Sequence, residues 1–252
     1  MLKLQNITKT YQEKVIVNSV SLTVDSGEIV VIVGESGSGK TTLLNIISGN
    51  IKPDSGSLML DNQEVDLYFN RLIRDFPTIK LVPQDYRLKP DYTVAENIDL
   101  ALTKFTSEYR IKRVQELLEL CGITEIKHKK SREISGGEKQ RTAIARAIAD
   151  EPLVLLLDEP FSNLDSINRT QLRSKIIEII KQEGIGCVLV THDLLDAFLV
   201  ADRIGIMQKG NLLLVDSPQN IFQQTENQYV RNFVDSAMQP IEVFLKSYAE
   251  LF

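Results

Sequence analysis

Apolar residues along the chain form short continuous runs and alternating stretches. Ile29–Val33 and residues 153–157 are continuous runs, typical of strands buried on both faces of a parallel sheet. Residues 2–8 and 15–24 alternate between apolar and polar positions, which predicts two half-buried strands at the N-terminus. These patterns predict an α/β protein with a mainly parallel core sheet and an N-terminal antiparallel β-subdomain.

Helical periodicity dominates the middle of the chain. Residues 93–103, 108–120 and 135–149 read as helices between a strand at 78–82 and the apolar run at 153–157. We therefore expect an α-helical subdomain, at about residues 84–150, inserted into the α/β core. Strands and helices then alternate to residue 215, and residues 217–252 read as two or three short helices. The predicted organisation is one domain over residues 1–236 and a short helical tail over 237–252.

Composition limits the classes of partner. The 252 residues carry a formal net charge of −5, which argues against a nucleic-acid partner. The N-terminus does not resemble a signal peptide, and no apolar run approaches the roughly 20 residues of a membrane span. We expect contact with a membrane to require a partner, and we expect Cys121 and Cys187 to be buried, reduced thiols.

A glycine-rich loop directly follows the first buried strand. Residues 34–41 fit the pattern G-x-x-x-x-G-K-[ST], placed between a predicted strand and a predicted helix. Glycines let backbone N–H groups face phosphate oxygens, and the helix N-terminus adds partial positive charge. Lys40 is expected to reach the β- and γ-phosphates and Thr41 to bind Mg²⁺. The predicted phosphate-binding residues are Gly34, Ser36, Gly37, Ser38, Gly39, Lys40, Thr41 and Thr42.

Two carboxylates end the second buried strand. Asp158 and Glu159 follow the run at 153–157, at the sheet edge where α/β proteins bind ligands. Alone, this pattern also fits an acidic turn after a core strand. Next to the Lys40 loop it predicts that Asp158 holds Mg²⁺, directly or through water, and that Glu159 is the general base for an attacking water.

A third motif, at residues 135–141, places a capping serine before two glycines. Ser135, Gly136, Gly137 and Glu138 predict a helix N-terminus able to bind an anion. Together the three motifs resemble the ATP-binding cassette (ABC) transporter ATPases, whose signature begins Ser-Gly-Gly. That family usually has Gln where this chain has Glu138, a common variant. The resemblance covers the whole chain in order and spacing.

The resemblance implies roles for four more residues. Tyr11 is similar to the aromatic residue that stacks on adenine, although a strand-edge aromatic is the alternative. Gln84 is similar to the glutamine that contacts Mg²⁺ and the water and senses the membrane partner. Asp165 lies in the segment that crosses the dimer interface, where the family often has Ala at position 163 instead of Asn163. His192 is similar to the switch histidine on the γ-phosphate, with a structural strand-end histidine as the alternative.

The resemblance also implies partners. Two copies would pack head to tail, with each ATP and Mg²⁺ held between the Lys40 loop of one chain and residues 135–138 of the other. The dimer would drive a membrane permease from the cytoplasmic face of the cell membrane. Tyr86, Leu88 and Tyr92 are expected either to line the permease groove or to belong to the subdomain core. The basic loop around His128 reads as a solvated face, with phospholipid or nucleic-acid contact as the minority interpretation.

Alternatives remain within and outside transport. Residues 84–98 and 216–233 resemble importer cassettes of the iron, polyamine and sugar group, which favours import. Export cassettes of lipoprotein-release or peptide-efflux systems are the second possibility. A soluble ABC ATPase of DNA repair or translation is disfavoured, because those proteins usually insert coiled coils or join two cassettes. A nucleotide kinase would not need the segment at residues 135–138.

Overall fold

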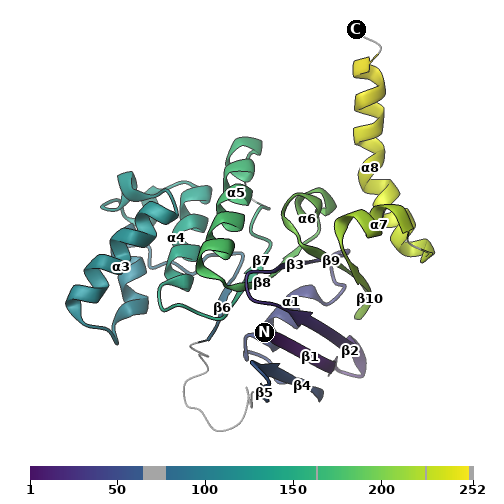
Figure 1. Cartoon of the computed structure of the whole chain (residues 1–252), viewed down its shortest axis with the longest axis horizontal. Helices are drawn as coiled ribbons and strands as arrows, with labels where there is room; N and C mark the ends of the chain where they lie inside the picture. The colour runs from purple at the N-terminus through teal and green to yellow at the C-terminus, as the bar shows by residue number, and fades with distance from the viewer. Residues whose placement is uncertain (65–77, 163, 225, 250–252) are drawn as a thin grey trace.

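The computed structural model describes residues 1–64, 78–162, 164–224 and 226–249. The first two long strands form a hairpin, and the first of them also pairs with a later strand in an antiparallel sheet (Figure 1). The order in this sheet is β2-β1-β4-β5. The strands are β1 (Leu2–Tyr11), β2 (Lys14–Val24), β4 (Ser55–Leu60) and β5 (Gln63–Glu64).

The second sheet has six strands in the order β10-β9-β3-β8-β7-β6. All neighbours run parallel except β10, which pairs antiparallel with β9. This confirms the predicted mainly parallel core and N-terminal antiparallel sheet. The strands are β3 (Ile29–Val33), β6 (Ile79–Val82), β7 (Val154–Asp158), β8 (Gly186–Thr191), β9 (Arg203–Gln208) and β10 (Asn211–Asp216).

Strand β3 explains why an unbroken apolar run is needed at the centre of the fold. Its residues are buried and alternate between two hydrophobic cores. Val30 and Ile32 pack into the core shared by helix α1 (Lys40–Ile47) and the antiparallel sheet. Ile29, Val31 and Val33 pack into the core formed by the helices on the other face. The side-chain period of two in a strand requires this division.

The helices between β6 and β7 gather at one end of the molecule, and β10 and the C-terminal helices lie at the other end (Figure 1). Thr93 and Ser135 each begin a helix with a capping box, as residues of this type do at helix N-termini. The helical elements are α2 (Val94–Asp99), η1 (Leu100–Leu102), α3 (Ser107–Leu120), η2 (Thr124–Ile126), η3 (Ser131–Glu133) and α4 (Gly136–Ile148).

Four helices follow β7. They are α5 (Ser166–Glu183), α6 (Leu194–Val200), α7 (Pro218–Gln224) and α8 (Gln228–Ala249). The sequence predicted two or three short helices at the C-terminus, but α8 is 22 residues long and projects away from the body (Figure 1). No glycine follows Gly210, so the sequence lacks the residue that most often ends a helix. Within the described ranges, no helix combines the length and hydropathy of a bilayer span.

Both cysteines are free and buried, as the sequence predicted. Burial raises the pKa of the Cys121 thiol to about 12 and that of Cys187 even further above its ordinary value. Both side chains lie in the helical core beside β3. They therefore behave as small apolar residues and not as nucleophiles.

Candidate nucleotide site

The loop after β3 has the geometry that its glycines predicted. A Cβ on Gly34 would lie 2.1 Å from the backbone oxygen of Met207, so only glycine fits there. Gly39, at φ +106°, would place a Cβ 2.4 Å from the backbone oxygen of Ile16. The loop is therefore pressed against β9 and β2, and it delivers the chain directly into the first turn of α1.

Lys40 turns back over its own loop. Its Nζ donates to the carbonyl oxygens of Gly34 at 2.8 Å and Glu35 at 3.0 Å. Burial lowers the pKa of the Lys40 ammonium, while the nearby charges of Glu159 and Asp158 act in the opposite direction. A partly desolvated ammonium beside a helix N-terminus favours a polyanionic ligand, which supplies the compensating charge.

The surroundings of Ser38 indicate whether a phosphate fits the loop. The side chain is 5% exposed, and its Oγ is buried with no hydrogen-bond partner among the described residues. A buried hydroxyl without a partner costs free energy unless a ligand or water supplies one. Ser36 and Gly37 are exposed at the mouth of the same loop. The loop therefore combines open access with one buried hydroxyl that a phosphate oxygen could satisfy, as a phosphate cradle requires.

Thr41 and Asp158 bring together two of the predicted Mg²⁺ ligands. Thr41 Oγ1 donates to Asp158 Oδ1 at 3.2 Å, across the edge between α1 and β7. Burial raises the pKa of the Asp158 carboxyl, and the neighbouring Glu159 adds to this, while Thr41 and Lys40 oppose it. Mg²⁺ in nucleotide sites commonly uses one or two protein oxygens together with phosphates and waters, so this donor pair fits the ion.

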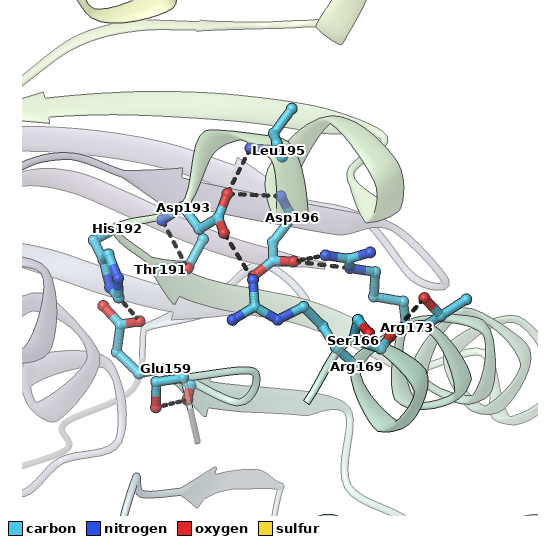
Figure 2. A network of polar contacts seen from close by, with 11 residues as sticks. Glu159, Ser166, Arg169, Arg173, Thr191, His192, Asp193, Leu195 and Asp196 are labelled. Atoms are coloured by element: carbon cyan, nitrogen blue, oxygen red, sulfur yellow. Dashed lines mark hydrogen bonds and ion pairs between the residues drawn. The ribbon is translucent and has the colours of Figure 1, made fainter. Parts of the chain in front are cut away.

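Glu159 and His192 meet at the ends of neighbouring strands. Glu159 Oε2 lies 2.9 Å from His192 Nδ1 (Figure 2). Glu159 has a left-handed backbone, φ +48°, and its N–H donates to the carbonyl of Val190 at 3.0 Å. The turn sends its side chain back over the sheet edge, where it is 16% exposed, whereas the imidazole is 60% exposed. A carboxylate paired with an imidazole has the composition of a general-base site.

Gln84 reaches the same edge through an intermediate residue. Its Nε2 donates to Ser162 Oγ at 3.2 Å, and Ser162 Oγ donates to the carbonyl oxygen of Glu159 at 3.0 Å. The chain of bonds joins the end of β6 to the turn that carries Glu159. Gln84 itself is exposed. The structure thus brings Gln84, Glu159, His192, Asp158 and Lys40 to the carboxyl edge of one sheet.

Among the described residues, the segment at residues 135–138 makes no hydrogen bond to this group and is held by its own helix cap. Ser135 Oγ accepts from Glu138 N at 3.4 Å, and Glu138 Oε2 accepts from Ser135 N at 2.7 Å. Burial works to raise the pKa of the Glu138 carboxyl, but the hydrogen bonds with Ser135 lower it overall. Glu138 therefore serves the helix cap, which leaves the N–H groups of Gly136 and Gly137 for another ligand.

The comparisons with known proteins agree with this geometry. The family model for ABC transporters matches residues 17–162. The spermidine/putrescine import ATP-binding protein PotA of Chromobacterium violaceum is 37% identical over 236 residues, which are 93% of this chain and 64% of that protein. The Fe(3+) ions import ATP-binding protein FbpC of Escherichia coli O157:H7 is 34% identical over 252 residues, 99% and 71% of the two chains.

This chain belongs to the ABC transporter family. It spans less than two thirds of the length of several curated relatives, 64% for that PotA and 62% for the putrescine transport protein PotG of Escherichia coli K12. A dimeric post-hydrolysis structure of the ATP-binding cassette MJ0796, bound to ADP and Pi, has a TM-score of 0.76 and 34% identity, and covers 86% of this chain and 99% of its own. The structure of cbiO1 from Clostridium perfringens has a TM-score of 0.83 and 28% identity, and the match covers 97% of this chain and 98% of cbiO1.

Tyr11 is the remaining residue that the ABC resemblance singled out for the nucleotide. It ends β1 at the hairpin to β2, and its side chain is 46% exposed. Lys9 Nζ lies 5.2 Å from the ring centroid. The ring is therefore exposed enough to stack on a ligand, and it stays a predicted adenine contact.

Asp165 takes a structural role that its position allows. It is the N-cap of α5, where Oδ1 accepts from Asn168 N at 3.0 Å and Oδ2 accepts from Asn168 Nδ2 at 2.6 Å. These hydrogen bonds lower the pKa of the Asp165 carboxyl. The neighbouring position, Asn163, lies outside the described residues. The predicted role of Asp165 at a dimer interface stays a prediction.

Residues that the sequence analysis did not single out tie the motifs of this ABC cassette together. Arg146 of α4 donates to the carbonyl oxygens of Tyr86 at 2.9 Å and Arg87 at 2.8 Å. It thereby joins the helix that begins at the signature to the loop after Gln84. Ser162 joins Gln84 to Glu159. The sequence shows Arg146 only as a basic residue on the inner face of a predicted helix. It does not indicate which residues the guanidinium contacts.

A groove with a volume of about 370 Å³ lies where α4 meets β6 and η1. Tyr86 and Leu88, predicted either to line a permease groove or to join the core, pack against the core, and Tyr92 is 43% exposed. The groove is lined instead by backbone and side chains of the strand, the loop and the helix. These include Leu81, Pro83, Arg87, Leu100, Ala143 and Ala147.

Proposed function

We propose that this chain is the ATP-hydrolysing subunit that powers a separate membrane permease, with import as the direction of transport. The observation that carries the proposal is the convergence of Lys40, the Thr41–Asp158 pair and the Glu159–His192 pair at one sheet edge. This set would supply a phosphate cradle, a metal site and a base at one sheet edge. A nucleotide kinase explains the first two but leaves the signature helix without a purpose.

The residues of the chain divide the work of phosphoryl transfer. Lys40, which holds loop carbonyls in this structure, would turn its ammonium to the β- and γ-phosphates. Bound Mg²⁺, held by Thr41 and Asp158, would neutralise phosphate charge. Glu159 would accept the proton of the attacking water, and His192 would keep that carboxylate oriented. Gln84, fixed through Ser162, would sense the same water and metal.

A second copy of the chain would complete each site. Gly136 and Gly137 are the first two residues of α4, and the N–H groups at these positions have no acceptor within the helix. An ATP bound at the Lys40 loop would offer its γ-phosphate to this helix end of the partner. The structural likeness to a dimeric ATP-binding cassette supports the proposal. Opening after hydrolysis would provide the mechanical step.

The groove beside α4 is the proposed permease site. Its lining includes Pro83, the residue before Gln84, and Arg146, which donates to the loop after Gln84. A cytoplasmic helix of a permease seated here would act directly on Gln84, at the cytoplasmic face of the membrane. The relatives named for polyamine and iron import favour import for this chain. We assign residues 1–236 to the ATPase domain, with the helical part at 84–150, although α8 continues through residue 236.

Two measurements test this function. ATP hydrolysis by the purified chain should require Mg²⁺ and rise more steeply than in proportion to chain concentration, because two chains form each site. A membrane protein with several transmembrane helices should co-purify with the tagged chain from its native host. A rate per chain that does not change with concentration contradicts the shared site, and co-purification with ribosomes or DNA instead of a permease contradicts transport.

A further inference from the structure

The position of His192 is set by its backbone. The imidazole is 60% exposed and touches Glu159, so packing does little to fix it. Thr191 Oγ1 accepts from Asp193 N at 3.1 Å, which closes the turn around His192. Asp193 Oδ1 then accepts from Leu195 N at 2.9 Å and Asp196 N at 3.4 Å, capping α6 (Figure 2). The turn and the cap together determine where the imidazole points.

The second carboxylate oxygen of Asp193 is held from another helix. Arg169 of α5 lies with its Nη1 2.9 Å from Asp193 Oδ2 and 3.8 Å from Asp196 Oδ2 (Figure 2). Asp196 is 1% exposed and also pairs with Arg173. Burial raises the pKa of the Asp196 carboxyl, and both arginines oppose the shift. Two guanidinium groups therefore balance two carboxylates and tie α5 to the His192 turn.

The same turn of α5 contacts the signature segment. Arg169 N donates to the carbonyl of Asp165 at 2.9 Å, and Asn168 is bonded to the Asp165 carboxylate. A Cβ placed on Gly137 would lie 3.3 Å from Asn168 Oδ1, so the Asn168 side chain lies close beside the backbone of Gly137. Residues 165–169 thus touch the signature helix on one side and the His192 turn on the other.

We propose that Arg169 is a positioning residue for His192, which transmits displacements of residues 165–169 to the imidazole through Asp193. The proposal rests on the proposed function, in which residues 135–138 face a second copy of the chain. Because one short turn contacts both segments, arrival of the partner's nucleotide at Gly137 moves α5, and α5 moves His192. The ion pair couples the two nucleotide sites of the dimer.

A double-mutant cycle tests the proposal. Hydrolysis is measured in single turnover, with chain in excess over ATP, for Arg169→Met, His192→Ala and the double variant. We expect Arg169→Met to lower the rate of turnover by about tenfold or more, with the KM for ATP changed less than about twofold. In the His192→Ala background, Arg169→Met should lower the hydrolysis rate by less than about twofold, because its effect passes through His192.

Conservative variants separate positioning from folding. Arg169→Lys keeps the charge and should restore part of the rate, whereas Lys175→Met, on the same helix but paired with Glu178, should leave the rate unchanged. If Arg169→Met does not fold, Asp193→Asn enters the cycle in its place, since it retains the α6 cap and loses the charge. A loss that is equally large with and without His192 overturns the proposal. Wild-type chain without Mg²⁺-dependent hydrolysis overturns the proposed function itself.

Discussion

His192 Nδ1 lies 2.9 Å from Glu159 Oε2, and the two residues leave the ends of neighbouring parallel strands. The pairing depends on the left-handed backbone at Glu159, which turns the carboxylate toward β8. A base whose orientation is fixed by a second group is a recurring arrangement in hydrolytic sites. The buried runs that form β7 and β8 therefore hold the two side chains of the proposed general-base site within contact distance.

Glu159→Gln should leave ATP binding intact and abolish most turnover. The amide preserves the size of the side chain but cannot accept the proton of the attacking water, so the rate should fall by about 10² to 10⁴. Phosphate release in steady state measures turnover, and a fluorescent ATP analogue measures binding. The variant should also trap an ATP-dependent dimer in gel filtration. Hydrolysis at the wild-type rate would show that another group is the base.

Ser162→Ala should lower turnover without weakening ATP binding. The substitution removes the link by which Gln84 is tied to the carbonyl of Glu159. Loss of one such hydrogen bond, about 1 kcal/mol, predicts a decrease in kcat of about fivefold. Ser174→Ala is the matched control, because Ser174 Oγ bonds only within the exposed surface of α5. Equal kcat values for the two variants would contradict a role for the link.

Ser135→Ala and Thr106→Ala remove the same kind of helix cap at two places. Ser135 caps α4 and Thr106 caps α3, each through an oxygen that accepts from the third residue of the helix. Each variant should lose about 1 kcal/mol of unfolding free energy. Only Ser135→Ala, made in the Glu159→Gln background, should lose the ATP-dependent dimer, since α3 has no predicted ligand. Denaturant unfolding and gel filtration measure the two effects.

The sequence indicated most of the fold because its signals are local. Unbroken apolar runs predicted β3 and β7. Glycines at positions where a Cβ would clash predicted the phosphate loop. The start of α5 shows the limit, because the residue that caps it is Asp165, which the sequence singled out only for a dimer interface. A cap is a single residue, and its acceptor role depends on a backbone turn that periodicity does not report.

The contacts between motifs required three dimensions. Arg146 and Arg169 are basic residues on helix faces, and sequence gives them no partner. The structure shows one bonded to the loop after Gln84 and the other to the residue after His192. Both partners are more than 20 positions away along the chain, as the sequence numbers show. Motifs in the sequence thus indicated the residues of the candidate site, and they did not indicate the residues that join them.

Asp158→Asn should change the stability of the nucleotide-free chain in a pH-dependent way. Burial raises the folded-state pKa of Asp158 above its ordinary 3.8, so the folded chain binds this proton more tightly than the unfolded chain. The resulting stability is fully present below pH 3.8 and is lost as pH rises through the raised pKa. The amide does not ionise, so the melting temperature of the variant relative to wild type should increase with pH.

Asp54→Asn is the control of opposite sign. The hydrogen bond from Lys9, aided by that from Thr10, lowers the pKa of the Asp54 carboxyl, so its stability is present above pH 3.8 and is lost as pH falls through the lowered pKa. Relative to wild type, this variant should therefore become less stable as pH rises. Thermal unfolding between about pH 2 and pH 8, without nucleotide or Mg²⁺, covers both titrations and compares the two variants. Parallel pH profiles for wild type and Asp158→Asn would show that burial does not raise the pKa of Asp158. Bound Mg²⁺ would then gain nothing from compensating a buried negative charge at this position.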